Sequence, residues 1–214
     1  MGAIRMGPPE ELILGLRQRG GLDHFVETGT FRGNTAVWAA AHFRQVTTIE
    51  MSPAIHAAAK ARFGSLSNVR AIEGDSRIVL GELVAGLAQP AIFWLDPHWS
   101  GLDTAGVDAE CPVLEELARI NASPQAHVVL VDDARLFCAP PPRPHRAEQW
   151  PDLSSLVGAL AASGRRHVVL FEDVFVAVPS EEKRFLSTWL QDSATAARAR
   201  SGGRFAALWR SLTS

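Results

Sequence analysis

Short apolar runs alternate with amphipathic segments along most of this sequence. The runs are rich in β-branched and aromatic residues, which predicts strands, and several of them end on an acidic residue. The predicted strands are a segment that begins at His24, followed by 45–50, 69–72, 91–95, 127–131, 167–171 and 174–178. The segments between them carry apolar residues at helical spacing. The predicted helices are 35–43, 53–62, 78–87, 113–120 and 153–162, with a further helix at each end of the chain.

This alternation of strands and helices predicts one α/β domain over residues 1–214. We expect a doubly wound, Rossmann-like sheet that is mostly parallel, with an antiparallel final strand and helices on both faces. An N-terminal helical segment (1–21) should precede the sheet, and a C-terminal helical tail (181–214), broken at Gly202-Gly203, should follow it. Residues 138–150 contain three consecutive prolines, which favours a loop or lid over a regular element.

Composition narrows the class of protein. A chain of 214 residues with 47% hydrophobic residues and a net charge of -2 fits a globular domain and argues against a basic nucleic-acid-binding protein. Cys111 and Cys138 are too few for a disulfide framework or a cysteine-rich zinc site. The sequence has no apolar run of membrane-spanning length, so we expect a cytoplasmic protein with no membrane partner.

A glycine-containing turn follows the first predicted strand, at residues 27–33. Gly29 can adopt a turn conformation closed to other residues, and Gly33 lets a ligand or a helix start approach the backbone closely. The turn lacks the G-x-G-x-x-G spacing of pyrophosphate sites, and Glu27 inside it would repel a pyrophosphate. A cationic or zwitterionic cofactor such as S-adenosylmethionine suits it better, although such a turn can also be only a turn.

Acidic residues end four further predicted strands, and in such a sheet these ends line one crevice. Glu50 lies about 20 residues beyond the glycine turn, the spacing at which an acid binds ribose hydroxyls in NAD enzymes and methyltransferases alike. Asp75-Ser76 should meet an adenine edge. Each acid alone could equally be a turn former or a helix cap. The predicted cofactor-binding residues are Glu27, Thr28, Gly29, Thr30, Gly33, Glu50, Met51, Asp75, Ser76 and Asp96.

Asp96, Asp132 and Asp133 follow neighbouring strands and could converge above the sheet. Three oxygen donors suit Mg²⁺ or Ca²⁺, which would acidify and orient a substrate hydroxyl. In the alternative interpretation Asp133 caps a turn and Asp132 pairs with Arg135. His98, two residues after Asp96, is the histidine best placed for proton transfer, so Asp96 and His98 are the catalytic candidates.

Five motifs carry a family resemblance when they are taken together. They are E-T-G-T-F-R-G, T-I-E, E-G-D-S-R, W-L-D-P-H-W and L-V-D-D-A-R-L-F, in this order along the chain. The set resembles the class I S-adenosylmethionine-dependent methyltransferases, and most of all the cation-dependent O-methyltransferases of the catechol and caffeoyl-CoA type. The resemblance covers roughly residues 24–178. It implies that the glycine turn and Glu50 bind the cofactor and that the three aspartates hold a divalent cation.

The sequence departs from the family at two positions. Asp133 stands where the family usually has Asn, and the family's catalytic Lys is missing from the segment that holds His98. The leading hypothesis is methyl transfer from S-adenosylmethionine to a small-molecule hydroxyl, assisted by Mg²⁺. The alternatives are a metal-independent N- or O-methyltransferase and a non-catalytic cofactor-binding protein, while an NAD oxidoreductase is disfavoured by the turn. No nucleic-acid partner is expected, and a homodimer is possible.

Overall fold

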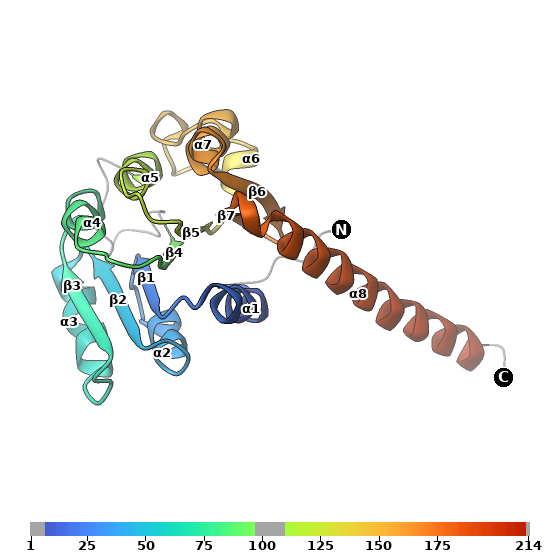
Figure 1. The fold of residues 1–214 in the computed structure, drawn as a ribbon. Coiled ribbons are helices and arrows are strands. Elements are labelled where there is room, and N and C mark those ends of the chain that lie inside the picture. The colour runs from blue at the N-terminus through green and yellow to red at the C-terminus, as the bar shows by residue number, and fades with distance from the viewer. Residues whose placement is uncertain (1–6, 97–109, 213–214) are drawn as a thin grey trace.

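A single seven-stranded sheet forms the centre of the molecule (Figure 1). The computed structural model describes residues 7–96 and 110–212, with side chains up to residue 199. The strand order is β3-β2-β1-β4-β5-β7-β6. Strands β1 to β5 are parallel, and β7 runs antiparallel to both β5 and β6. The strands are β1 (His24–Thr28), β2 (Gln45–Glu50), β3 (Val69–Glu73), β4 (Ile92–Leu95), β5 (Val128–Val131), β6 (Arg166–Phe171) and β7 (Val174–Pro179).

Helices cover both faces of the sheet, as the sequence predicts (Figure 1). One apolar core joins the sheet to α4 (Ser76–Ala85), α5 (Val113–Asn121) and α7 (Leu153–Ala161). The other joins it to α1 (Glu10–Gly20), α2 (Asn34–Ala40), α3 (Pro53–Arg62) and the start of α8 (Lys183–Leu212). Successive strand residues feed opposite cores because side chains alternate along a strand. The doubly wound, mostly parallel fold with an antiparallel final strand is therefore confirmed.

The N-terminal helix packs on the sheet. Leu12, Ile13 and Leu16 of α1 are buried in the core that α1 shares with α2 and α8. Gly21 ends the helix in the left-handed conformation, at φ 61°, which glycine adopts at little cost. The N-terminal helical segment predicted over residues 1–21 therefore ends where expected.

The C-terminal helix departs from its prediction. The backbone of α8 continues from Lys183 to Leu212 without a break at Gly202-Gly203, so the predicted break is wrong. A glycine inside a helix costs only about 1 kcal/mol relative to alanine, and the flanking segments are rich in good helix formers. Figure 1 shows α8 leading away from the sheet. No helix within residues 7–96 or 110–212 is both long and apolar enough to cross a bilayer.

The proline-rich segment is mostly irregular, in agreement with the prediction. It follows a single helical turn, α6 (Arg135–Cys138), and contains a short 3-10 turn, η1 (Ala147–Gln149). Ordered contacts nevertheless hold this segment to the start of α5, as described below.

Candidate functional site

The carboxyl ends of the five parallel strands meet at one edge of the sheet. Gly29 N donates a hydrogen bond to Ile49 O at 3.0 Å, and Asp96 N donates to Thr28 O at 3.3 Å. On the outer sides, Gly74 N donates to Glu50 O at 2.9 Å and Asp132 N donates to Leu95 O at 2.9 Å. The backbone therefore brings the predicted cofactor residues and two of the predicted metal ligands to one edge.

The glycine turn brings β1 against the end of β4. Gly29 has φ +81°, and a Cβ on it would lie 2.7 Å from the backbone oxygen of Asp96. Gly33 has φ +72°, and a Cβ there would lie 2.6 Å from the Phe63 ring. Both glycines are therefore required by backbone conformation and by space. Gly33 itself is the N-cap of α2, and no side chain caps the helix.

Glu27 is a buried carboxyl in β1, with 2% of its surface exposed. The Thr48 hydroxyl donates a hydrogen bond to Glu27 Oε2 at 2.6 Å. The hydroxyl oxygens of Thr30 and Thr48 also lie 2.6 Å apart, within hydrogen-bonding distance. Burial raises the pKa of Glu27 to about 8; the hydroxyls of Thr48 and Thr35 oppose the rise, and the carboxylates of Asp96 and Glu50 add to it. Among the described residues, the partners that act on Glu27 are thus hydroxyls and acids, with no cation.

Glu50 has a different environment at the end of β2. Its Oε2 accepts a hydrogen bond from Phe31 N at 3.1 Å, and its Oε1 accepts one from Ser52 N at 2.9 Å. These bonds fix the carboxylate between the glycine turn and the start of α3. Each oxygen retains a lone pair for a further donor, such as a ribose hydroxyl. The neighbouring Met51 is 45% exposed and presents an apolar surface beside the acid.

Asp75 is engaged within its own helix. It caps α4 by accepting a hydrogen bond from Arg77 N at 2.9 Å, and the Arg77 guanidinium binds both of its oxygens at 2.5–3.0 Å. The Arg77 side chain holds the pKa of Asp75 below its usual range, although partial burial opposes this shift. Ser76 is the first residue of α4. The acid predicted to meet the adenine therefore already has a strong partner.

One of the predicted metal ligands, Asp133, is paired with an arginine. Arg135 Nη1 lies 2.5 Å from Asp133 Oδ1 and also pairs with Asp173, whose other oxygen accepts a bond from Arg135 N. The Arg135 guanidinium thus engages the Asp133 carboxylate, which a metal ion would also have to bind. Across residues 7–96 and 110–199, no group of three or more His, Cys, Asp or Glu side chains is arranged to hold a metal ion. The divalent cation stays a prediction.

The alternative interpretation predicted one turn contact and one pair with Arg135, and both exist, but each involves the other aspartate. Asp132 Oδ1 accepts a hydrogen bond from Asp133 N at 2.8 Å, and Asp133 has φ 55°. Asp132 therefore stabilises the turn, and Asp133 is the partner of Arg135. Of the two catalytic candidates, Asp96 lies against Gly29, whereas His98 lies outside the described residues.

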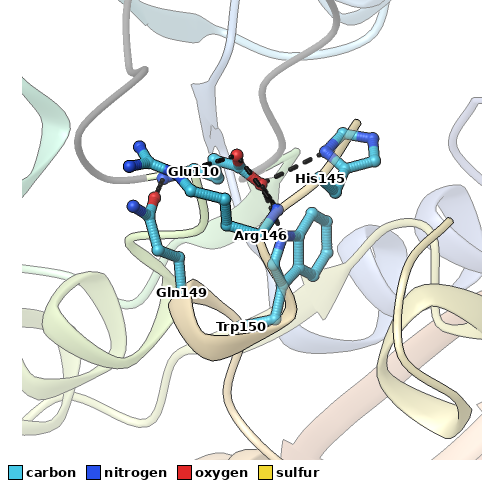
Figure 2. Close-up of polar contacts among 5 residues, drawn as sticks. All are labelled: Glu110, His145, Arg146, Gln149 and Trp150. Atoms are coloured by element: carbon cyan, nitrogen blue, oxygen red, sulfur yellow. Dashed lines mark hydrogen bonds and ion pairs between the residues drawn. The ribbon is translucent and has the colours of Figure 1, made fainter. Parts of the chain in front are cut away.

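A second buried acid, Glu110, anchors the proline-rich loop. Figure 2 shows His145, Arg146 and Trp150 converging on its carboxylate. Trp150 Nε1 donates at 3.1 Å, Arg146 N donates at 3.0 Å, and His145 Nδ1 lies at 3.3 Å. Burial alone would raise the pKa of Glu110, but these bonds outweigh it and hold the pKa below its usual range. Its backbone N–H also donates to Gln149 at 3.0 Å, so the loop is tied to the start of α5.

Glu116 is a site residue that the sequence interpretation missed. It is 1% exposed and lies on the buried stripe of α5 with Val113, Leu117 and Ile120. A glutamate at a helical position that should be apolar was the available signal. A cavity of about 640 Å³ was also not predicted; it opens between Phe31 and Arg32 of the turn and the side of α3.

The comparisons with known proteins concern the fold. No protein-family model and no curated protein matches the sequence. A candidate caffeoyl-CoA O-methyltransferase from Staphylococcus aureus superposes with a TM-score of 0.59 at 15% identity, over 83% of this chain and 86% of the other. The O-methyltransferase TomG from Streptomyces achromogenes, in complex with S-adenosylmethionine, gives 0.56 at 16% identity, over 83% and 82%.

Methyltransferases of another kind also match. A candidate rRNA methylase from Clostridium thermocellum gives a TM-score of 0.55 at 9% identity, over 82% of this chain and 99% of the other. At such identities the likeness establishes the fold, and it does so in agreement with the strand order and the antiparallel β7. This chain has the Rossmann-like fold of the S-adenosylmethionine-dependent methyltransferases.

Proposed function

We propose that this protein transfers the methyl group of S-adenosylmethionine to a hydroxyl group of a small molecule. The observation that carries the proposal is Glu27, a buried acid in the glycine turn whose described partners include no cation. Leaving a buried carboxylate without a cationic partner is costly, so a positively charged ligand group beside it is favourable. S-adenosylmethionine has an ammonium and a sulfonium, whereas the pyrophosphate of NAD is anionic.

The remaining cofactor residues suit an adenosine. Glu50 has an acceptor site left on each oxygen for the ribose hydroxyls, and Met51 offers an exposed apolar surface next to it. On this proposal Gly29 lets the methionine part of the cofactor approach the backbone between Glu27 and Asp96. The chain's main contribution to the rate is then to hold donor and acceptor in line.

Asp96 is the residue we assign to the acceptor hydroxyl. Its backbone lies against Gly29, so its side chain belongs to the boundary between the cofactor and the substrate. In the reaction the acceptor oxygen forms a bond to the methyl carbon while the carbon–sulfur bond breaks, which releases S-adenosylhomocysteine. The hydroxyl proton passes to a base, and Asp96 and His98 are the candidates for that role. The divalent cation stays a separate prediction that this scheme does not use.

Binding is the first test of this proposal. Calorimetric titration should show that S-adenosylmethionine and S-adenosylhomocysteine bind while NAD does not. Binding of NAD alone would overturn the assignment of the cofactor.

Turnover is the second test. Transfer of a labelled methyl group should then be followed with a library of hydroxylated small molecules and with structured RNA, each with and without EDTA. We expect transfer to a hydroxylated compound, and Asp96→Asn should lower the rate by at least about tenfold while leaving cofactor affinity within a few-fold.

Each other outcome identifies an alternative. Transfer only to RNA would move the protein to another class of methyltransferase. Loss of activity in EDTA would favour the hypothesis of a metal-assisted reaction. Cofactor binding without turnover would favour a non-catalytic binding protein.

A further inference from the structure

Glu116 is a buried carboxyl that the proposed reaction does not use. It lies in the first turn of α5, where Val113, Leu117 and Ile120 on the same face are fully buried. An acidic side chain at such a position is rare unless it is bonded or serves a function.

The groups that act on Glu116 all belong to residues that the sequence predicts to bind the cofactor. The hydroxyls of Ser76 and Thr28 and the carboxylates of Asp75 and Asp96 all act on it. Burial raises the pKa of Glu116 to about 7; the two hydroxyls oppose the rise, and the two carboxylates add to it. Glu116 comes from α5, and the four groups that act on it lie at the ends of β1, β3 and β4.

Two polar atoms in this pocket are buried without a hydrogen bond. Among the described residues, neither Glu116 Oε2 nor Thr28 Oγ1 has a partner. The hydroxyl of Thr28 lies near enough to lower the pKa of Glu116, yet it does not satisfy Oε2. Buried polar atoms are nearly always bonded in native proteins, so an unfilled pair at a crevice indicates a missing ligand group or water.

Asp75 and Glu50, two of the acids at this edge of the sheet, already have donors on both oxygens. Arg77 binds both oxygens of Asp75, and two backbone N–H groups bind those of Glu50. Glu116 Oε2 is thus a carboxylate oxygen with an open position beside the residue predicted to meet the adenine. The hydrogen-bond donor on the base edge of adenine is its exocyclic amine, while the ring nitrogens there are acceptors.

We infer that Glu116 determines specificity for adenine by accepting a hydrogen bond from its exocyclic amine. This inference rests on the proposed function, because it concerns the same cofactor. Glu116 is only 1% exposed, so the contact is made beneath the strand ends, directly or through one bridging water. Hypoxanthine carries a carbonyl oxygen in place of the amine. The Glu116 carboxylate would then face another hydrogen-bond acceptor, so this contact would be lost.

The test compares two ligands that differ at this group. Dissociation constants for S-adenosylhomocysteine and S-inosylhomocysteine are measured by calorimetry at pH 8.5, where the Glu116 carboxyl is ionised. The wild-type protein should prefer the adenosine compound by at least about tenfold, the usual worth of a hydrogen bond to a charged group. In Glu116→Gln the preference should fall to within about threefold, because the amide can also donate to the hypoxanthine oxygen.

Glu115→Gln is the matched control. Glu115 lies in the same helical turn and carries the same charge, but it is exposed, so its variant should keep the wild-type preference. If Glu116→Gln does not fold, Glu116→Leu supplies a side chain of similar size that suits the apolar stripe and makes no hydrogen bond. It too should lose the preference.

Three results would overturn the inference. They are a wild-type preference near unity, a Glu116 variant that keeps the wild-type ratio, and an equal loss in Glu115→Gln. In each of these cases S-adenosylhomocysteine still binds, and the proposed function survives. If the wild-type protein binds neither compound, the proposed function fails, and the inference fails with it.

Discussion

Two buried acids at the carboxyl ends of the strands have opposite environments. On the β1 side, Glu27 is 2% exposed and its described partners are threonine hydroxyls. On the β5 side, Asp133 is 5% exposed and Arg135 lies 2.5 Å from its carboxylate. The first acid has a pKa raised to about 8, whereas the second belongs to an ion pair that also includes Asp173.

This difference indicates which side of the strand ends would bind a charged ligand. The β1 side gains most when a cation enters, because such a ligand compensates a carboxylate that is costly to ionise. The β5 side already contains its own cation, so a neutral group, such as an uncharged hydroxyl compound, disturbs it least. The contrast is consistent with a cationic donor on one side and a neutral acceptor on the other.

Removing the acid on the β1 side should have the largest effect. In Glu27→Gln we expect the affinity for S-adenosylmethionine to fall by about 10- to 100-fold at pH 8.5, the usual worth of a hydrogen bond to a charged group. Calorimetry measures the change directly. Glu82→Gln, which neutralises an exposed acid on α4, should bind as the wild type does. An affinity change of less than threefold in Glu27→Gln would remove the basis of the comparison.

Removing the cation on the β5 side should mainly affect stability. Arg135→Met leaves Asp133 and Asp173 buried without their shared partner, which costs 3–5 kcal/mol for fully buried pairs. Because Arg135 is 41% exposed, we expect about 2 kcal/mol, measured by urea unfolding. The exposed Arg143→Met is the control. Millimolar Mg²⁺ should stabilise Arg135→Met more than the wild type. Equal stabilisation of both proteins would count against a metal site that Arg135 blocks.

The pH dependence of stability should show the smallest effect. Glu27 has a pKa of about 8 in the folded protein against 4.5 ordinarily, so between these values only the folded state holds the proton. This contribution to stability is complete below pH 4.5 and is lost as the pH rises toward 8. From pH 6 to pH 7 it should decline by about 1 kcal/mol. Glu116, whose pKa is also raised, contributes a decline of its own in both proteins. Urea unfolding should therefore show a steeper decline in the wild type than in Glu27→Gln, by about 1 kcal/mol from pH 6 to pH 7, and parallel curves would refute the raised pKa of Glu27.

The sequence was a good guide to the strands and a poorer guide to the partners of the acids. The strand at Gln45–Glu50 was predicted with its observed bounds, because an apolar run that ends on an acid is a local signal. The pairing of Asp133 with Arg135 was assigned to the wrong aspartate, because it depends on the left-handed backbone at Asp133 and on the distant Asp173. Neither is encoded near the pair.

Glu110 shows the same limit, whereas Glu116 does not. Glu110 is bonded by residues 35 to 40 positions away, so its role as an anchor could not be read from its neighbours. Glu116 did carry a local signal, since it interrupts the apolar face of a strongly amphipathic helix. The break predicted in the tail relied on a local signal that the rest of the helix overrode.

The contact between Gly29 and Asp96 sets a fixed length in the crevice. Since no side chain separates the glycine turn from the backbone oxygen of Asp96, the spacing between the two strand ends is a property of the main chain. Rotamer changes, which alter most distances in an active site, cannot alter this one. On the proposed function, a methyl donor beside Gly29 and an acceptor beside Asp96 would therefore be held by backbone atoms, which favours a constant alignment between them.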